Sequence, residues 1–422
     1  MQPVVSYFTR IDRNTFDALN WRRIRRDGIF SYFLGILRTV IYCVLGFALS
    51  VILCPLSLFK LIEIWLMPLG PDKASHFIDG IEGHLRRSQL ENTKNSLKVV
   101  VWPQKFPNEA LAIIYRKIAY ILGPKQEFLF KVLPFVIWRV KVFNHEVCKT
   151  GEFFLKRTNL GGISVSFSED ENRKGRKLVS DIFGDENKKF IMFGYASPKY
   201  RELVDQKYHP EDDVFTYVPD PLNYLKMIEK LNTVGIGVVR QGLHLDEMRE
   251  LSRAGLVVPS YENFASGFPD VWLAANCKFL LSAITGSWWF GLPFNKPAVI
   301  TDAYSPNNLC GLKSNLFIHQ LPWNLKEERY ENFAWMRANP RWCFSSQKLG
   351  IEYISVKNSP EQIIDVVDEQ LARLNGTWVE TDEDVELQQR VQRFVWGKDA
   401  DPAYLPRVGA KFLREHQHLL PD

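Results

Sequence analysis

The sequence has 422 residues, which is enough for about two domains of ordinary size. Its hydrophobic fraction of 46% and charged fraction of 24% are those of a globular protein with a full core, and they exclude a disordered chain. The net charge of +5 is mild for this length and does not indicate a nucleic-acid-binding protein. The six cysteines show no metal-ligand spacing, so we expect free thiols in a reducing compartment and no metal site.

The first predicted element is an apolar segment at residues 29–69. Within it, Thr39 to Phe59 is a 21-residue run without a charge, long enough to cross the hydrocarbon core of a bilayer. It starts too far from Met1, and lacks a clear small-residue cleavage site, to be a typical signal peptide. Seven arginines precede the uncharged run, and the positive-inside rule keeps such an N-terminus in the cytoplasm. They are Arg10, Arg13, Arg22, Arg23, Arg25, Arg26 and Arg38.

Two membrane geometries fit this segment. A single span places everything after Leu69 outside the cytosol. Alternatively, Pro55 breaks the segment into a shallow hairpin that enters and leaves on one side, because proline removes a backbone donor and kinks helices. The second half, Leu56 to Leu69, contains Lys60 and Glu63 and therefore resembles an interfacial segment. We favour the hairpin or interfacial geometry, with cytoplasmic domains; a long buried core helix is the remaining alternative.

The next segments are predicted to form a first α/β domain. Lys98 to Trp102 reads as a buried strand, and Asn108 to Leu122 as an amphipathic helix. The polar stretch from Ser166 to Lys189 has the composition of a solvated linker or surface loop. We place the boundary between two domains in this stretch.

Strands and helices alternate through the second half of the chain. Such alternation predicts right-handed βαβ units and a parallel sheet. The predicted strands are Lys189 to Phe193, Gly235 to Val239, Gly255 to Val258, Cys277 to Leu281 and, as the last clear one, Ala298 to Ile300. The predicted helices are Pro221 to Leu231, Leu245 to Leu251, Pro269 to Ala275, a helix from Gly286, Glu361 to Leu374 and a tail helix from Val408 to Leu420.

The carboxyl ends of these strands form one edge of the predicted sheet, where ligands of parallel sheets bind. Five residues are expected to gather there: Gly194, Arg240, Ser260, Ser282 and Asp302. Between two of the strands lies the turn Thr285-Gly286-Ser287, followed by a helix start. Backbone N–H groups and the positive end of a helix dipole suit a phosphate, and glycine permits close approach. The turn is therefore predicted to bind a phosphate-bearing ligand, although an ordinary helix cap explains the same residues.

Several motifs give the chain a resemblance to a family of bacterial glycosyltransferases with the two-domain GT-B architecture, of the polysaccharide-biosynthesis type. The resemblance covers most of the chain after about Ile81. It is strongest over Phe268 to Asp302, which includes Asp270, Cys277-Lys278-Phe279, Thr285-Gly286 and Pro297. It also includes Glu82-Gly83-His84-Leu85, Pro107 to Lys117, Pro221 to Gly242 and Arg407 to Leu420.

The resemblance implies an α/β fold with two Rossmann-like domains of GT-B type behind an N-terminal membrane-associated helical segment. The implied parts are a basic arm at 1–28, the membrane segment at 29–69, an acceptor domain at 70–175, a nucleotide-sugar-binding domain at 186–375 and a helical tail at 376–422. The implied activity is transfer of a sugar from a nucleotide-sugar to a lipid-linked or membrane-proximal glycan acceptor, without a metal or other cofactor. No nucleic acid partner is expected.

The candidate site residues follow from the motifs and from their places on the sheet edge. Arg240 can grip a diphosphate with two parallel hydrogen bonds, unless it pairs with a carboxylate. His84 is the candidate base, with Glu82 and Glu91 as competitors and a structural role as the alternative. Asp270 and Asp302 are candidates for ribose or sugar hydroxyl contacts, or else for capping. The predicted donor-binding set is Gly194, Arg240, Gly242, Asp270, Ser282, Thr285, Gly286, Ser287 and Asp302.

The chain departs from the family pattern at two places. Family members carry an arginine-aspartate pair and a tyrosine where this chain has Phe193 to Pro198, and a second arginine where it has Tyr208 to Asp212. The alternative hypothesis is therefore a catalytically inactive, membrane-anchored binding or scaffold protein that keeps the GT-B fold.

Overall fold

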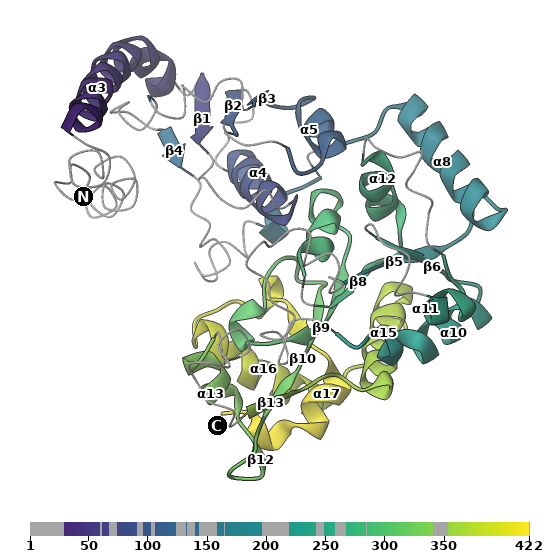
Figure 1. Cartoon of the computed structure of the whole chain (residues 1–422). Coiled ribbons are helices and arrows are strands. Elements are labelled where there is room, and N and C mark those ends of the chain that lie inside the picture. Colours follow the sequence, from purple (N-terminus) through teal and green to yellow (C-terminus); the bar gives the residue numbers. More distant parts are fainter. Residues whose placement is uncertain are drawn as a thin grey trace. The chain divides into compact units, whose positions relative to one another are not determined.

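The computed structural model describes most of the chain as two compact units (Figure 1). The described residues are 29–59, 61–66, 74–90, 96–102, 106–123, 132, 140–142, 158–163, 165–195, 219–241, 249–257, 267–283, 285–340, 342 and 353–421. Unit 1 comprises Met1–Asp72, Asn92–Phe106 and Tyr115–Asn144, and unit 2 comprises Lys73–Glu91, Pro107–Ile114 and His145–Asp422. The five-part division of the chain made from the sequence stays a prediction.

Unit 1 contains a four-stranded parallel sheet with the strand order β3-β2-β1-β4. Its strands are β1 (Ile62–Leu66), β2 (Leu97–Val101), β3 (Tyr120–Leu122) and β4 (Val140–Val142). The predicted strand at Lys98 to Trp102 is thus confirmed within one residue. Only the first part of the predicted helix at Asn108 to Leu122 is α-helical, as α5 (Glu109–Tyr115), because the last three residues pair with β2 as β3.

The apolar segment near the N-terminus forms one helix, α3 (Ile29–Leu58), which continues through Pro55. Its 22-residue stretch Tyr32–Leu53 has a mean hydropathy of 2.3 and is 11% buried, so by length and composition alone it could cross a membrane. Exposed apolar side chains such as Phe33, Val44 and Ile52 lie along its length. The hairpin prediction fails in its second half, because residues 62–66 are a sheet strand with Trp65 fully buried.

Unit 2 is built on a seven-stranded, wholly parallel sheet, as predicted, with the order β14-β10-β9-β8-β5-β6-β7. Chain order runs outward from β5 through β6 to β7, then returns to β8 on the other side of β5. A sheet that reverses in this way has its topological switch point between the two central strands, here β5 and β8. The strands are β5 (Phe190–Gly194), β6 (Gly237–Arg240), β7 (Leu256–Val257), β8 (Leu280–Ala283), β9 (Ala298–Ala303), β10 (Leu316–His319) and β14 (Arg407–Val408).

Helices cover both faces of this sheet. On one face, α10 lies beside α15, and α15 also packs against β9, β10 and α17 (Figure 1). On the other face, α12 packs against both α8 and η8, and α4 lies along η8. The helices are α4 (Ala74–Leu90), α8 (Glu169–Phe183), α10 (Leu225–Thr233), α12 (Phe268–Asn276), η8 (Gly286–Phe294), α15 (Pro360–Asn375) and α17 (Ala410–Glu415).

The polar stretch at Ser166 to Lys189 was predicted to be a loop, and this is wrong, because α8 occupies most of it. Ser168 and Glu171 form a capping box, and Gly184 ends the helix in a left-handed conformation. A methyl group on Gly175 would lie within 2.0 Å of the Trp272 ring, so glycine lets α8 pack directly on α12. The charged residues that favoured a linker form surface ion pairs instead, such as Arg173 with Asp170 at 2.6 Å.

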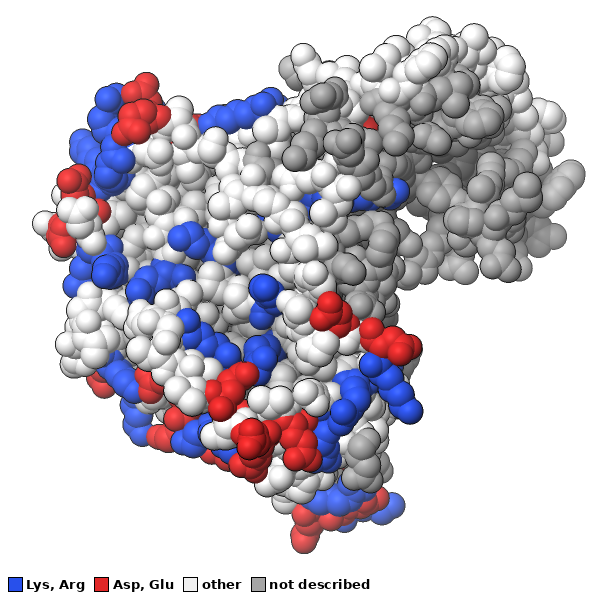
Figure 2. Space-filling view, turned by 180° about the vertical axis from the view of Figure 1, so that it is seen from behind, with Lys and Arg blue, Asp and Glu red and all other residues white. Residues whose placement is uncertain are grey.

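The structure continues beyond the strand that the sequence marked as the last clear one. β10 and β14 extend the sheet, and a three-stranded antiparallel sheet is formed by β11 (Leu321–Asn324), β12 (Arg329–Tyr330) and β13 (Tyr353–Val356). The acidic stretch near residue 380 starts a further helix, α16 (Asp382–Trp396), because Thr381 and Asp384 form a capping box. On the face shown in Figure 2, acidic and basic side chains are interspersed at the margin. Cross-helix pairs such as Lys226 with Glu361 are exposed.

A buried arginine fastens α4 to η8. The Arg86 side chain is 1% exposed; its Nη1 donates to the carbonyl of Thr158 and its Nη2 to that of Leu292. Nη2 also donates to Asn295 Oδ1 at 2.7 Å, and Nε pairs with the fully buried Glu82 at 2.9 Å. At the other end of α4, Ser75 lies against Gly286, so the two helices run side by side in the same direction.

We expect Arg86→Met to destabilise the protein by about 3–5 kcal/mol, because it leaves the Glu82 carboxylate buried without its cation. Adding Glu82→Gln should recover part of the loss. Urea unfolding followed by tryptophan fluorescence measures both variants. Arg173→Met, which breaks an exposed ion pair, is the control and should change stability by less than about 1 kcal/mol. A loss of stability for Arg86→Met as small as that for Arg173→Met would contradict the view that Arg86 fastens α4 to η8.

Candidate functional site

Three hydroxyl groups meet at the switch point of the seven-stranded sheet. Ser282 belongs to β8, Thr285 precedes η8 as its N-cap, and Ser287 lies in the first turn of η8. Their oxygens are 2.6 Å apart for Ser282 and Ser287, 2.7 Å for Thr285 and Ser287, and 3.1 Å for Ser282 and Thr285. The predicted turn thus exists, although its helix is a 3-10 helix, with glycines and Pro293 inside it.

The hydroxyl cluster has more close oxygen pairs than protons. Ser282 Oγ also lies 2.6 Å from the carbonyl of Ala283, which makes four pairs for three protons. In addition, the backbone N–H of Ser287 donates to Thr285 Oγ1 at 3.3 Å. One contact is therefore always without a proton. Each hydroxyl can rotate to donate its proton to an acceptor-rich ligand, at the cost of a hydrogen bond within the cluster.

The end of β5 lies directly against the hydroxyl cluster. Gly194 pairs with Ser282 in the sheet, and a methyl group on Gly194 would lie 2.5 Å from Ser287 Oγ and 3.3 Å from Gln241 Oε1. Only glycine leaves room for these neighbours at the end of the strand. Gln241, 7% exposed at the end of β6, was not predicted; its position directly after Arg240 at a strand end was the available signal.

Arg240 is buried beside this point rather than projecting into solvent. It is 3% exposed; its Nη2 donates to the carbonyl of Tyr195 at 2.8 Å, and its guanidinium lies 4.4 Å from the centre of the Tyr195 ring. Nη1 also donates to the carbonyl of Phe193 at 3.4 Å. In this position the cation holds the end of β5 and places positive charge close to the switch point.

Asp302 lies at the same edge but has a clear structural partner. It ends β9 with a positive φ of 53°, and its carboxylate accepts from the backbone N–H of Asn358 at 2.8 Å, while Asn358 Oδ1 accepts from its own N–H at 2.6 Å. Burial raises the pKa of the Asp302 carboxyl, and Lys357 opposes the rise. This reciprocal pair fastens the loop before α15 to the sheet.

The other predicted site residues lie on the surrounding elements. Asp270 is in the first turn of α12, which follows β7 and so begins at the carboxyl edge, and its acidic side chain complements the helix dipole there. His84 is on α4, 9% exposed, within the same compact unit as the seven-stranded sheet. Gly242 and Ser260 lie outside the described residues.

A buried carboxyl group on α4 was not predicted. Asp79 is 3% exposed, one helical turn after Ser75, whose hydroxyl touches Gly286 of the candidate turn. Its Oδ1 has no hydrogen-bond partner among the described residues. Burial raises the pKa of Asp79 to about 7, so this carboxyl changes charge near neutral pH. Nothing in the sequence marks it, because its burial depends on α4 packing along η8.

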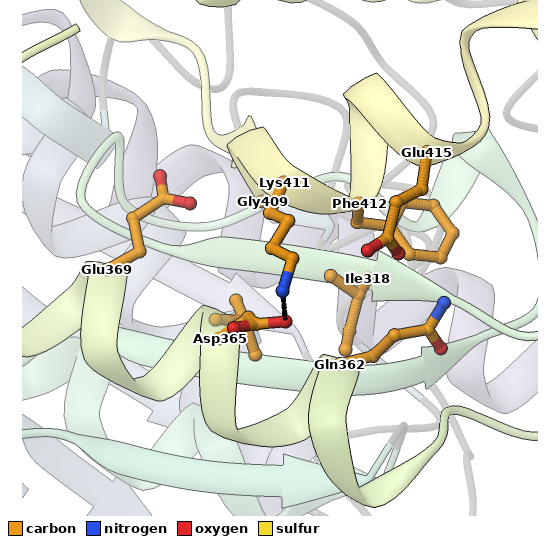
Figure 3. Close-up of a pocket in the computed structure, with 9 residues that line it drawn as sticks. Ile318, Gln362, Asp365, Glu369, Gly409, Lys411, Phe412 and Glu415 are labelled. Atoms are coloured by element: carbon orange, nitrogen blue, oxygen red, sulfur yellow. Dashed lines mark ion pairs between the residues drawn. The ribbon is translucent and has the colours of Figure 1, made fainter.

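A small hollow elsewhere in unit 2 is unrelated to this edge (Figure 3). It lies between α15 and α17, where Lys411 pairs with Asp365 at 2.7 Å, and has room for about one water molecule. Across the described ranges, no group of three or more histidine, cysteine, aspartate or glutamate side chains is placed to hold a metal ion.

Comparison with known proteins does not assign the chain to a family. No protein-family model matches the sequence, and no curated protein is significantly similar to it. A glycosyl transferase family 9 protein from Veillonella parvula is 12% identical, with 57% of this chain and 81% of that chain covered and a TM-score of 0.37. The E. coli heptosyltransferase WaaC with ADP-2-deoxy-2-fluoro heptose is 12% identical, with 61% of this chain and 93% of that chain covered and a TM-score of 0.29. TM-scores below 0.5 do not establish a common fold.

We expect Gly194→Ala to weaken binding of nucleoside diphosphates by about tenfold or more, because the new methyl group displaces Ser287 from the hydroxyl cluster. Titration calorimetry with the common nucleoside diphosphates measures this. Gly162→Ala is the matched control, since no atom lies within 4 Å of the added methyl group. Equal affinities for the two variants would contradict the site.

Asp79→Asn should stabilise the protein increasingly as pH rises. The folded-state pKa of about 7 lies above the unfolded value of 3.8, so the native carboxyl stabilises the fold fully only below about pH 4 and loses that contribution as pH rises to 7. The difference between variant and parent should grow by up to about 1.4 kcal/mol per pH unit and level off above pH 7. Denaturation midpoints from pH 4.5 to 8 measure it; a constant difference would contradict the buried, isolated carboxyl.

Proposed function

We propose that this protein is a membrane-associated glycosyltransferase that binds a nucleotide-sugar donor at the switch point of unit 2. The observation that carries the proposal is the hydroxyl cluster at the carboxyl ends of β5 and β8, beside Gly194. A doubly wound parallel sheet binds nucleotides at this place, and a helix start there suits a diphosphate. The motifs over Phe268 to Asp302 support a nucleotide-sugar rather than a dinucleotide, because no dinucleotide fingerprint follows β5 or β6.

In this proposal the chain stabilises the leaving diphosphate without a metal ion. Thr285, Gly286 and Ser287 supply hydroxyl and backbone donors, and η8 adds the positive end of its dipole. Arg240 contributes charge from beside the site, through the position of β5. These groups act most strongly on charge that develops as the sugar leaves, which is the requirement for catalysis rather than mere binding.

Unit 1 is the proposed acceptor domain of a GT-B architecture. Its four strands follow the same outward-and-return order as the first four strands of unit 2, which is the pattern of a second Rossmann-like unit.

His84 stays the proposed base, and Asp79 is a further candidate, because its pKa of about 7 suits proton transfer at neutral pH. The exposed apolar helix α3 supports a membrane-proximal or lipid-linked glycan acceptor. The proposed cytoplasmic placement rests on the arginines of the N-terminal arm and the positive-inside rule.

The test is turnover of a panel of nucleotide-sugars by the full-length protein, with released nucleotide measured by mass spectrometry. We expect one donor to be consumed, and the double variant Thr285→Val, Ser287→Ala to lose about 10–150-fold in kcat/KM, the effect of removing hydrogen bonds to a charged group. Thr233→Val is the control, since its exposed hydroxyl bonds only to the Lys230 carbonyl among the described contacts.

The second candidate function is an inactive, membrane-anchored scaffold, which the missing family arginines favour. It predicts that no donor is consumed and that no nucleoside diphosphate raises the thermal transition. Stabilisation by a nucleoside diphosphate together with turnover would rule it out.

A further inference from the structure

The starting edge of the unit 1 sheet carries a row of exposed apolar side chains, which we call the amino-terminal rim. It consists of Phe59, 76% exposed, Leu61, 54%, Leu97, 47%, and Tyr120, 66%. Leu61 precedes β1 and Leu97 begins β2, while Tyr120 begins β3 at the level of Val99, two residues further along β2; these three strands are neighbours in the sheet. Single exposed apolar residues are ordinary, but four along one edge mark a surface that is covered by something apolar.

The amino-terminal rim adjoins the end of α3, because Phe59 directly follows Leu58, the last residue of the helix. The helix ends at Leu58 and β1 begins at Ile62, so three residues connect them, a reach of about 10 Å. Backbone hydrogen bonds fix this junction: the N–H of Leu61 donates to the carbonyl of Leu56 at 2.8 Å, and the N–H of Leu97 donates to the carbonyl of Leu61 at 2.7 Å. One backbone hydrogen bond, from the N–H of Leu61 to the carbonyl of Leu56, therefore joins the end of α3 to the residue before β1.

The turn beside the rim is basic. Arg116 and Lys117 are exposed and lie between α5 and β3, at the starting end of β3. Among the described residues at the starting ends of β1, β2 and β3, Glu63 is the one carboxylate, and it is 8% exposed. The rim thus combines apolar and aromatic side chains with positive charge, the composition of surfaces that bind anionic bilayers.

We propose that the amino-terminal rim is a second membrane-binding surface, which lies in the headgroup region of an anionic bilayer where α3 enters it. The headgroup layer is about 5–7 Å thick on each side, so side chains that adjoin the end of α3 lie at its depth. Tyrosine and phenylalanine place apolar rings at this depth, while the basic turn contacts lipid phosphates.

This orientation leaves the carboxyl ends of the unit 1 strands in water. The rim and the carboxyl ends of the strands are opposite edges of one sheet, about 17 Å apart for five-residue strands. The geometry holds whether α3 spans the bilayer or lies along its surface, because the junction with β1 is the same. It is also independent of glycosyl transfer.

Photo-crosslinking to lipid in the full-length protein tests the proposal. Benzoylphenylalanine replaces Tyr120 or Leu97, the protein is reconstituted into vesicles of phosphatidylethanolamine and phosphatidylglycerol, and lipid adducts are counted by mass spectrometry after illumination. Both exposed positions accept a large aromatic group. The matched controls are Val234, 61% exposed, and Val379, 81% exposed, both in unit 2. A probe at Val44 of α3, 63% exposed, reports the helix itself.

We expect adducts at Tyr120 and Leu97 to exceed those at both controls. Rim adducts no greater than the controls would overturn the proposal, with or without adducts at Val44. The double variant Arg116→Gln, Lys117→Gln should lower the rim adducts on vesicles with phosphatidylglycerol by about fivefold per charge removed, and leave those on neutral vesicles unchanged. Insensitivity to both the variant and the lipid charge would overturn the electrostatic part.

Discussion

The close approach of β5 to the turn after β8 is the constraint on which the rest of the candidate site depends. Gly194 ends β5, the strand at which the chain order of the sheet reverses, and a side chain there would overlap Ser287. The same point receives the starting end of η8, the three hydroxyl groups and, through Ser75, the first turn of α4. An anion placed there meets donors from separate parts of the chain without any of them moving far, which is the preorganisation that phosphate binding and leaving-group stabilisation require.

Two buried arginines hold the elements that surround this point. Arg240 is held by the carbonyl of Tyr195 and by its ring, so it positions the end of β5. Arg86 fixes α4 along η8 by binding main-chain carbonyls and Glu82. Both guanidinium groups act through the elements that they hold. In the proposed function, helix ends and hydroxyl groups carry the contacts to the anion in place of the arginines that the resemblance implies.

Much of this architecture could be predicted from the sequence. The alternation of short apolar runs with amphipathic segments located the parallel sheet, and the strand ends located Gly194, Ser282 and Thr285 on one edge. α8 was missed because its composition is that of a solvated loop, although Ser168 and Glu171 are a capping box. β10 and β14 were missed, and their length does not explain this, because β6, β7 and β8 are just as short and were predicted. Asp79 could not be found from the sequence, since its pKa depends on burial by segments distant in the chain. The hairpin prediction failed because β1, with one charged residue among apolar ones, has the same composition as a segment that lies at a membrane interface.

The central claim is that the switch point of unit 2 binds the diphosphate of a nucleotide-sugar. An experimental structure of the full-length protein with a nucleoside diphosphate that raises its thermal transition tests this claim most directly. The account predicts phosphate oxygens within hydrogen-bonding distance of Thr285 and Ser287 and of the backbone N–H groups that start η8, with Gly194 in contact with the ligand. A nucleotide bound elsewhere, with the hydroxyl cluster unchanged and still closed on itself, would contradict it.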